Sequence, residues 1–310
     1  RTAGTYYMRI KAAKTIGGAG TFDCGASALD PIPFTAKHTI TGGAAWYING
    51  ASGLTMTVYA AEPAIKSILL SAEAIGQTEL SVDTDITADI WADGDTVRID
   101  DNVAAFESEE RVIAAGGRAV SAITVTAGLT AAKNAGAVMH LMTRNVMFIQ
   151  ESGAQNIAKS FASGKLTIAG GFWNNKSNRV FGSCVGMVVS GGAFSSCGSG
   201  GQIFDNCTNF TISGGVFTNA SDMVIGATGG VISGGYFSGW SNCIAGTGMT
   251  ISGGTFRCGA NYAITLDGGT ILNAIVDGCN YGVHGVGVIF GGTITGFISA
   301  LTNFAGTVVN

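Results

Sequence analysis

A short string of residues recurs along the second half of the chain and constrains its fold more than any other feature. The string reads Ile-Ser-Gly-Gly-x-Phe at 212–217, 232–237 and 251–256, with related copies at 168–173 and 189–194. The first glycines of these five copies are separated by 21, 23, 20 and 19 residues, and weaker copies follow at 270–273 and 288–292. A fixed period near 20 residues is typical of solenoid proteins.

The segments between the glycines are too short for helices. β-Branched residues bounded by Gly-Gly predict strands joined by tight turns. We therefore predict an all-β chain in which 151–310 form a parallel β-helix of about seven turns, each strand lying on its equivalent in the next turn. The crossover preference of parallel strands favours right-handed winding. The alternative, hairpin turns of a β-sandwich, does not explain why one string keeps its register over five copies.

The repeat also predicts which side chains point inward. One column should hold the aliphatic residues Ile168, Val189, Ile212, Ile232, Ile251 and Ile271. A second column should hold the aromatic residues Trp173, Phe194, Phe217, Phe237 and Phe256. Asn242, Asn261 and Asn280 are each 19 residues apart and should form a ladder at one corner of the coil.

Composition excludes several classes of protein. The chain has 49 Gly but only 3 Pro, which excludes collagen, and 46% of its residues are apolar, enough for a substantial core. Its net charge of −4 offers no basic surface for nucleic acid or an anionic membrane. No uncharged run is long enough to span a bilayer, so we expect no membrane span and no nucleic-acid partner.

Charge divides the chain into two regions. Residues 1–150 carry 15 acidic and 11 basic side chains, whereas 151–310 carry five of each. Glycine divides the other way, with 15 residues in the first region and 34 in the second. We predict an N-terminal β-rich cap or assembly domain over 1–150 and the coil over 151–310.

The glycine repeat resembles the broad family of right-handed parallel β-helix proteins, which includes pectate-lyase-like enzymes, phage tailspikes and surface adhesins. Residues 91–99, Trp-Ala-Asp-Gly-Asp-Thr-Val-Arg-Ile, and 141–146, Leu-Met-Thr-Arg-Asn-Val, are similar to a glycine-containing ectodomain module that precedes β-helices in some extracellular proteins. The resemblance implies an exported protein, on a cell surface or a virion surface, more than it implies an activity.

No catalytic, cofactor-binding or metal-binding residue is assigned from the sequence. A polysaccharide-cleaving coil needs clustered carboxylates, whereas those of the second half stand one to a turn: Glu151, Asp205, Asp222, Asp267 and Asp277. Calcium is conceivable at the acidic run Asp83, Asp85, Asp89, Asp93, Asp95, Asp100 and Asp101, but the spacing of a twelve-residue calcium loop is missing. His38, His140 and His284 lack metal-ligand spacing, and 17–20 is a glycine turn rather than a phosphate loop.

The seven cysteines are an odd number. Cys184 and Cys207 lie 23 residues apart, the same interval as Gly191 and Gly214, so they should occupy adjacent turns within disulfide distance. Cys258 and Cys279, 21 apart, form a second candidate pair. A disulfide and a column of buried thiols both remain open.

Two functions fit these features. The first is a non-enzymatic structural subunit of an extracellular filament, surface layer or virion appendage, which associates head to tail with copies of itself because 297–310 is apolar and offers no cap. The second is a carbohydrate-directed protein: a tailspike, an adhesin that binds a surface glycan, or a lyase or hydrolase. Its sugar groove would be lined by exposed aromatic residues such as Trp173, Tyr236, Trp240, Tyr262 and Tyr281.

Overall fold

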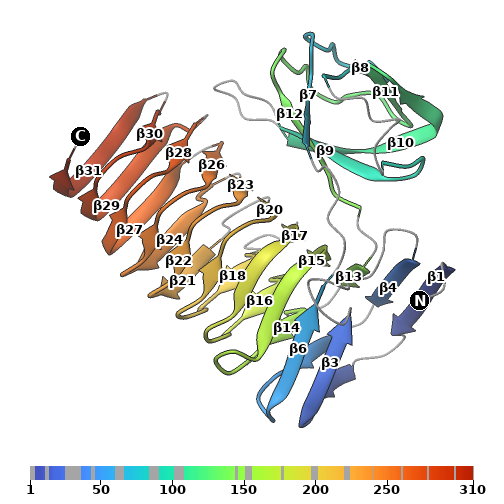
Figure 1. Ribbon diagram of the computed structural model, residues 1–310. Coiled ribbons are helices and arrows are strands. Elements are labelled where there is room, and N and C mark those ends of the chain that lie inside the picture. Colours follow the sequence, from blue (N-terminus) through green and yellow to red (C-terminus); the bar gives the residue numbers. More distant parts are fainter. Residues whose placement is uncertain are drawn as a thin grey trace. The chain divides into compact units, whose positions relative to one another are not determined.

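The computed structural model contains strands and no helix in the part of the chain that it describes (Figure 1). The described residues are 4–10, 14–24, 36–42, 46–59, 66–83, 91–100, 108–143, 146–150, 156–175, 178–196, 202–219, 224–239, 241–259, 261–277, 279–296 and 298–309. They form two compact units. The first comprises Arg1–Ala61 and Arg144–Asn310, and the second comprises Glu62–Thr143.

The first unit is a coil of parallel strands with three faces, called here A, B and C. Face A stacks β1 (Gly4–Ile10), β4 (Ala36–Gly42), β13 (Val146–Gln150), the later part of β15 (Leu166–Asn175), the later part of β17 (Val188–Ser196), β20 (Val216–Asn219), β23 (Tyr236–Gly239), β26 (Thr255–Cys258), β28 (Ile275–Val276) and β30 (Thr293–Ile294). We number the turns of the coil by the order of these face A strands, from turn 1 at β1 to turn 10 at β30.

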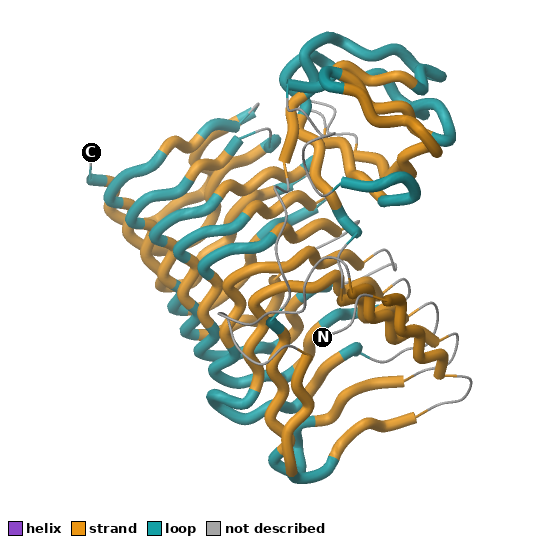
Figure 2. Tube along the Cα trace, turned by 45° about the vertical axis from the view of Figure 1, so that its right-hand side comes forward, coloured by secondary structure: helices purple, strands orange, loops and turns teal. Residues whose placement is uncertain are grey.

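Face B stacks β2 (Lys14–Gly17), β5 (Trp46–Asn49), β14 (Ala158–Lys159), β16 (Phe181–Gly182), β18 (Phe204–Asp205), β21 (Val224–Thr228), β24 (Ile244–Thr247) and the first parts of β27 (Tyr262–Ile271), β29 (Tyr281–Ile289) and β31 (Ser299–Val308). Face C stacks β3 (Gly20–Cys24), β6 (Leu54–Val58), the first parts of β15 and β17, β19 (Thr211–Ile212), β22 (Val231–Ile232), β25 (Thr250–Ile251) and the last parts of β27, β29 and β31. All these pairings are parallel, which confirms the predicted parallel β-helix. Figure 2 shows the successive turns in one unbroken stack.

The domain division predicted from charge differs from the one in the structure. Residues 4–58 are not part of a separate cap, because β1 to β6 form the first two turns of the coil. The coil then resumes at β13, which pairs directly with β4. The charged stretch is instead an insertion between turns 2 and 3. The first two turns escaped the sequence pattern because they lack the Ser-Gly-Gly-x-Phe string.

Both predicted interior columns are present. The six aliphatic side chains are fully buried, and the register pairs Ile212 with Ile232 and Ile232 with Ile251. Phe194 stacks on Phe217 with ring centroids 4.8 Å apart, and Phe217 stacks on Phe237 at 4.5 Å. Continuous burial of this kind, roughly 1.5–3 kcal/mol for each large apolar side chain, stabilises a coil that has few charges.

The second glycine of each string turns the chain into face A. Gly235 and Gly254 have φ angles of +104° and +100°, in the region that glycine adopts without a Cβ penalty. The ring of Phe237 lies beneath this corner, 3.1 Å from where a Cβ of Gly235 would stand. The phenylalanine two residues after the glycine pair is therefore part of the same corner.

The second unit is a six-stranded antiparallel sheet in the order β7 (Lys66–Ile68), β12 (Val138–Leu141), β9 (Thr96–Asp100), β10 (Ser108–Ala119), β11 (Ala122–Val125) and β8 (Glu79–Ser81). An antiparallel bridge between Leu69 and Val82 connects the last strand back to the first. Trp91 lies in its core, and the Asp95 carboxylate accepts a hydrogen bond from the Ala92 N–H at 2.7 Å. The Trp-x-x-Gly-Asp string of the resemblance is therefore a structural turn.

A buried ion cluster lies in this second unit. The Lys133 ammonium, fully buried, is 3.1 Å from the Glu109 carboxylate, which also contacts Arg111 and accepts hydrogen bonds from the Thr130 N–H and hydroxyl. Burial alone would raise the pKa of Glu109, but the hydrogen bonds from Thr130 and Lys133 outweigh it and hold the pKa below its ordinary value. The cluster fastens the loop before β12 to β10.

Candidate functional site

Half-buried aromatic side chains gather on face B of turns 8 and 9. Tyr262 and Tyr281 are partners in the β27–β29 register, and their ring centroids are 5.2 Å apart. The His284 ring lies 4.5 Å from the Tyr262 ring, at an angle of 33°. All three side chains are partly exposed. Ile264 and Val283, two positions after Tyr262 and Tyr281 on the same strands, are buried in the core. We call Tyr262, Tyr281 and His284 the aromatic patch.

Tyr262 and Tyr281 are the first residues of β27 and β29, and the two residues after each of them are buried. His284 follows the buried Val283, so the alternation of strand side chains turns it outward beside them. The Nδ1 atom of His284 is buried and has no hydrogen-bond partner. The patch therefore combines two partly exposed phenol rings with a partly exposed imidazole ring, whose Nδ1 atom lies beneath the surface.

The corner before the patch is held by amide side chains. Asn242 accepts a hydrogen bond from the Tyr262 N–H at 3.3 Å, and Asn261 donates one to the Ser241 hydroxyl at 3.0 Å. Asn242 donates to the same hydroxyl. The described contacts of Asn242 and Asn261 run through Ser241 and the backbone, and the predicted asparagine ladder stays a prediction.

Two carboxylates of the coil each pair with an arginine. Asp277 accepts a hydrogen bond from Arg257 at 2.9 Å, and Asp205 accepts one from Arg179 at the same distance. Burial lowers the pKa of the Arg257 guanidinium, but the neighbouring Tyr236 and Asp277 more than offset this and leave it raised. Asp267 is exposed. Glu151 and Asp222 lie outside the described residues.

The exposed aromatic residues proposed from the sequence divide into three groups. Tyr236, Tyr262 and Tyr281 are partly exposed. Trp173 is fully buried and stacks on Phe148 at 4.1 Å, so its assignment to a sugar groove is wrong: it belongs to the interior column. Trp240 lies outside the described residues. His284 was missed as a patch residue because a lone histidine carries no spacing signal until the fold places it beside Tyr262.

The described carboxylates of the acidic run form hydrogen bonds and an ion pair within the second unit. Asp83 accepts hydrogen bonds from the Ser67 hydroxyl and the Ile68 N–H, and Asp93 pairs with Arg118. Within the described ranges, no group of three or more His, Cys, Asp or Glu side chains is arranged to hold a metal. His140 is buried in this unit. The side chain of His38 lies outside the described residues.

Five cysteines are buried inside the coil as free thiols. Cys184 and Cys207 occupy adjacent turns as predicted, and a hydrogen bond between them together with burial raises the pKa of Cys207. Cys243, Cys258 and Cys279 form a second group, in which the Cys258 N–H donates to the Cys279 sulfur at 2.9 Å. Both candidate pairs, Cys184 with Cys207 and Cys258 with Cys279, are therefore buried free thiols in the structure rather than disulfides.

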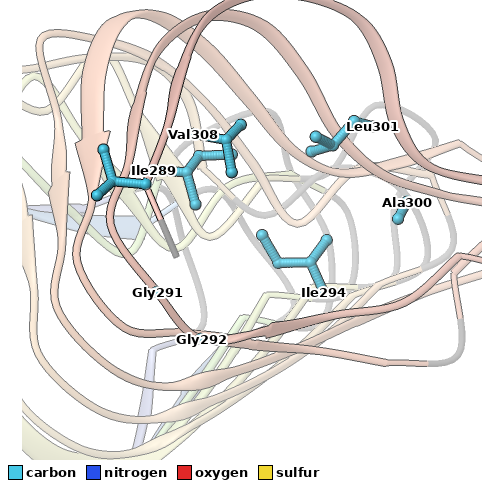
Figure 3. Close-up of a pocket in the computed structure, with 8 residues that line it drawn as sticks. Ile289, Gly291, Gly292, Ile294, Ala300, Leu301 and Val308 are labelled. Carbon is cyan, nitrogen blue, oxygen red and sulfur yellow. The ribbon is translucent and has the colours of Figure 1, made fainter.

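An apolar hollow opens over the last described turn, beside β31. The side chains of Ile289, Ile294, Leu301 and Val308 line it (Figure 3). Val308 and Val309 are 48% and 42% exposed. Ile289 continues the interior column that begins with Ile168, so the hollow lies over the last described layer of the core. The turn at 17–20 is a glycine turn, as predicted.

Comparisons with known proteins concern the fold. No family model and no curated protein matches the chain. Among solved structures, the tailspike gp61 of Pseudomonas phage phi297 is 12% identical, with a TM-score of 0.31, over 97% of this chain and 64% of that one. The tailspike gp49 of Pseudomonas phage LKA1 is 11% identical, with a TM-score of 0.32, over 99% of this chain and 67% of that one.

The third similar structure is the Gp54 tailspike of Acinetobacter baumannii bacteriophage AP22, in complex with A. baumannii capsular saccharide. It is 10% identical, with a TM-score of 0.28, over 97% of this chain and 74% of that one. The chain thus spans 64% of the length of the first of these tailspikes. In the residues described here, no helix has the length and apolar character needed to cross a membrane. By its own strand pairing, the chain is a parallel β-helix protein.

Proposed function

We propose that this protein is a carbohydrate-binding β-helix of a cell surface or virion surface, the second of the two functions that its sequence leaves open. The aromatic patch carries the proposal. Sugar rings present C–H groups on their faces and hydroxyls at their edges, and amphipathic aromatic side chains beside polar groups suit both. Tyr262, Tyr281 and His284 supply such a surface on a rigid, continuously packed support.

Binding is proposed rather than cleavage because of how the described carboxylates are used. Asp205 and Asp277 are each held by an arginine, on different turns of the coil. Cleavage by acid–base chemistry takes two carboxylates on either side of one bond. The described charges of the coil support recognition of an uncleaved glycan.

The test is a glycan array followed by calorimetry with the best-retained oligosaccharide. Tyr281→Ala should weaken binding by about tenfold or more, since central aromatic contacts dominate small interfaces. Tyr47→Ala is the matched control. Tyr47 is a half-buried tyrosine on face B of turn 2, and the Lys159 ammonium lies over its ring. Retention of no glycan, or equal binding by the Tyr281→Ala protein, would contradict the proposal.

Self-association is the second candidate, supported by the apolar hollow. Leu301, Val308 and Val309 expose apolar side chains beside the outer edge of β31, which pairs with β29 alone among the described strands. Such an edge accepts another strand. Sedimentation velocity over a concentration series should then show oligomers that Val308→Lys disperses, whereas a monomer at every concentration would reject this candidate.

A further inference from the structure

Each tyrosine of the aromatic patch directly follows an asparagine in the chain. Asn261 precedes Tyr262 on turn 8, and Asn280 precedes Tyr281 on turn 9. Because Tyr262 and Tyr281 are partners in register, the same dipeptide stands at the same place on both turns. The Tyr281 N–H donates to the Asn261 carbonyl oxygen at 3.2 Å, which joins the two dipeptides through the backbone.

The side-chain amide of Asn261 is held in one orientation by Ser241, on turn 7. Asn261 Nδ2 donates a hydrogen bond to the Ser241 hydroxyl at 3.0 Å, and Asn242 Nδ2 donates to the same oxygen at 3.3 Å. Asn242 in turn accepts a hydrogen bond from the Tyr262 N–H at 3.3 Å. Ser241 therefore holds the Asn261 amide directly and the start of β27 through Asn242.

This orientation decides which end of the Asn261 amide a ligand can use. A side-chain amide has a donor end, the NH₂ group, and an acceptor end, the oxygen. Ser241 holds the donor end, whereas no described residue donates to Asn261 Oδ1. Asn261 is exposed, so a ligand can reach this oxygen. The patch thus has a hydrogen-bond acceptor on the residue next to the partly exposed Tyr262.

Resting on the proposed function, we infer that Asn261 makes the aromatic patch selective for sugars that carry an acetamido group. Such a group has an N–H donor and a methyl group close together. The N–H donates to Asn261 Oδ1, and the methyl group packs against the neighbouring tyrosine ring. A hydroxyl at the same position of the sugar has no methyl group to pack there. Asn261 is then a specificity-determining residue, and Ser241 is a positioning residue.

The test is calorimetry with pairs of array glycans that differ only by an acetamido group in place of a hydroxyl, chitotetraose and cellotetraose among them. The acetamido member of a pair should bind about fivefold more tightly or better. Asn261→Ala should bring the two members to equal affinity. Asn273→Ala, at another exposed asparagine of turn 9, should keep the preference. Because the preference is a ratio measured on one preparation, a misfolded fraction does not change it.

Ser241 is tested by its own pair of variants. Ser241→Ala should reduce the preference for the acetamido member, and Ser241→Thr, which keeps the hydroxyl, should restore it. A merely structural role would weaken the binding of both members equally, and that result would overturn the role of Ser241.

Two results would overturn the selectivity of Asn261: equal binding of both members by the wild type, or a preference that survives Asn261→Ala. If both members then still lose affinity in Tyr281→Ala, the proposed function stands without this inference. If the array retains no glycan of either kind, the proposed function itself fails.

Discussion

Gly234 lies against the carbonyl oxygen of Ser213 on the preceding turn, so close that a Cβ at residue 234 would come within 2.4 Å of that oxygen. The same relationship joins Gly253 to Ser233, again at 2.4 Å. In the three exact copies of the string, at Gly214, Gly234 and Gly253, the first glycine is therefore required because successive turns approach too closely for a Cβ. This contact, rather than any ligand, accounts for its recurrence.

Gly234→Ala should destabilise the coil by about 1–3 kcal/mol, because the added methyl group forces the two turns apart. Gly291→Ala is the matched control: it occupies the equivalent position on the last described turn, where a Cβ would meet only the Leu272 oxygen at 3.2 Å. Denaturant unfolding of both variants measures the difference. Equal losses of stability would refute the close-approach explanation.

Phe217→Ala should cost about 3–5 kcal/mol, because the ring stacks between Phe194 and Phe237 and its removal leaves a cavity. Phe290→Ala is the control, since that side chain is 51% exposed and should change stability by no more than about 0.5 kcal/mol. The midpoint of chemical unfolding reports both. A small effect at Phe217 would mean that the column can collapse around the gap.

The interior of the coil could be predicted well from the sequence. Each string places its aliphatic and its aromatic side chain against the equivalent side chain of the next turn, so both recur at a fixed spacing. Ile232 and Phe237 could be placed inward from spacing alone. The first two turns could not be identified, since Trp46 and Ile48 fill the same core without a repeated string. Their membership follows only from pairings such as Ile48 with Ala158, which join distant parts of the chain.

Glu109→Gln should destabilise the second unit by about 3–5 kcal/mol, because it removes the carboxylate charge that lies 3.1 Å from the fully buried Lys133 ammonium. Glu110→Gln is the control: its contact with Arg98 is longer, at 3.9 Å, and its side chain is 33% exposed. Hydrogen exchange of peptides from residues 62–143 reports this unit separately. Equal protection in both variants would contradict the role assigned to Glu109.

The same carboxylate predicts how the second unit responds to acid. Because folding lowers the pKa of Glu109 below its ordinary value of 4.5, the stabilisation is present above that value and is lost as the pH falls through the folded-state pKa. Hydrogen exchange in this unit should therefore accelerate as the pH falls below about 5, relative to the intrinsic rate. Glu109→Gln should remove that dependence, and an unchanged dependence would assign it to another group.

The coil thiols should react at least about tenfold more slowly with a thiol reagent in the folded protein than in denaturant, because burial disfavours the reactive thiolate. Peptide mapping should find Cys184, Cys207, Cys258 and Cys279 all labelled after unfolding without reductant, as expected for free thiols. A missing pair among them would identify a disulfide and reverse the assignment.

The candidate sites were only partly visible in the sequence. Tyr262 and Tyr281 could be proposed as exposed aromatic residues, and Asp277 as an isolated carboxylate. That Arg257 holds Asp277, or that His284 lies on Tyr262, follows from how the strands of turns 8 and 9 are stacked. Side chains 20 to 22 positions apart become neighbours only when the length of each turn is known.

The insertion between turns 2 and 3 affects the order in which the coil can form. Ile40 and Phe148 pair across that junction although they are 108 positions apart, and closing so long a loop in an unfolded chain carries a large entropic cost. Within the insertion, however, β7 pairs with β12, so Ser67 faces Met139 and the two ends meet. Once the insertion has folded, the loop that separates the two turns is effectively short. Rapid growth of the coil across this junction therefore depends on the earlier folding of the segment that interrupts it.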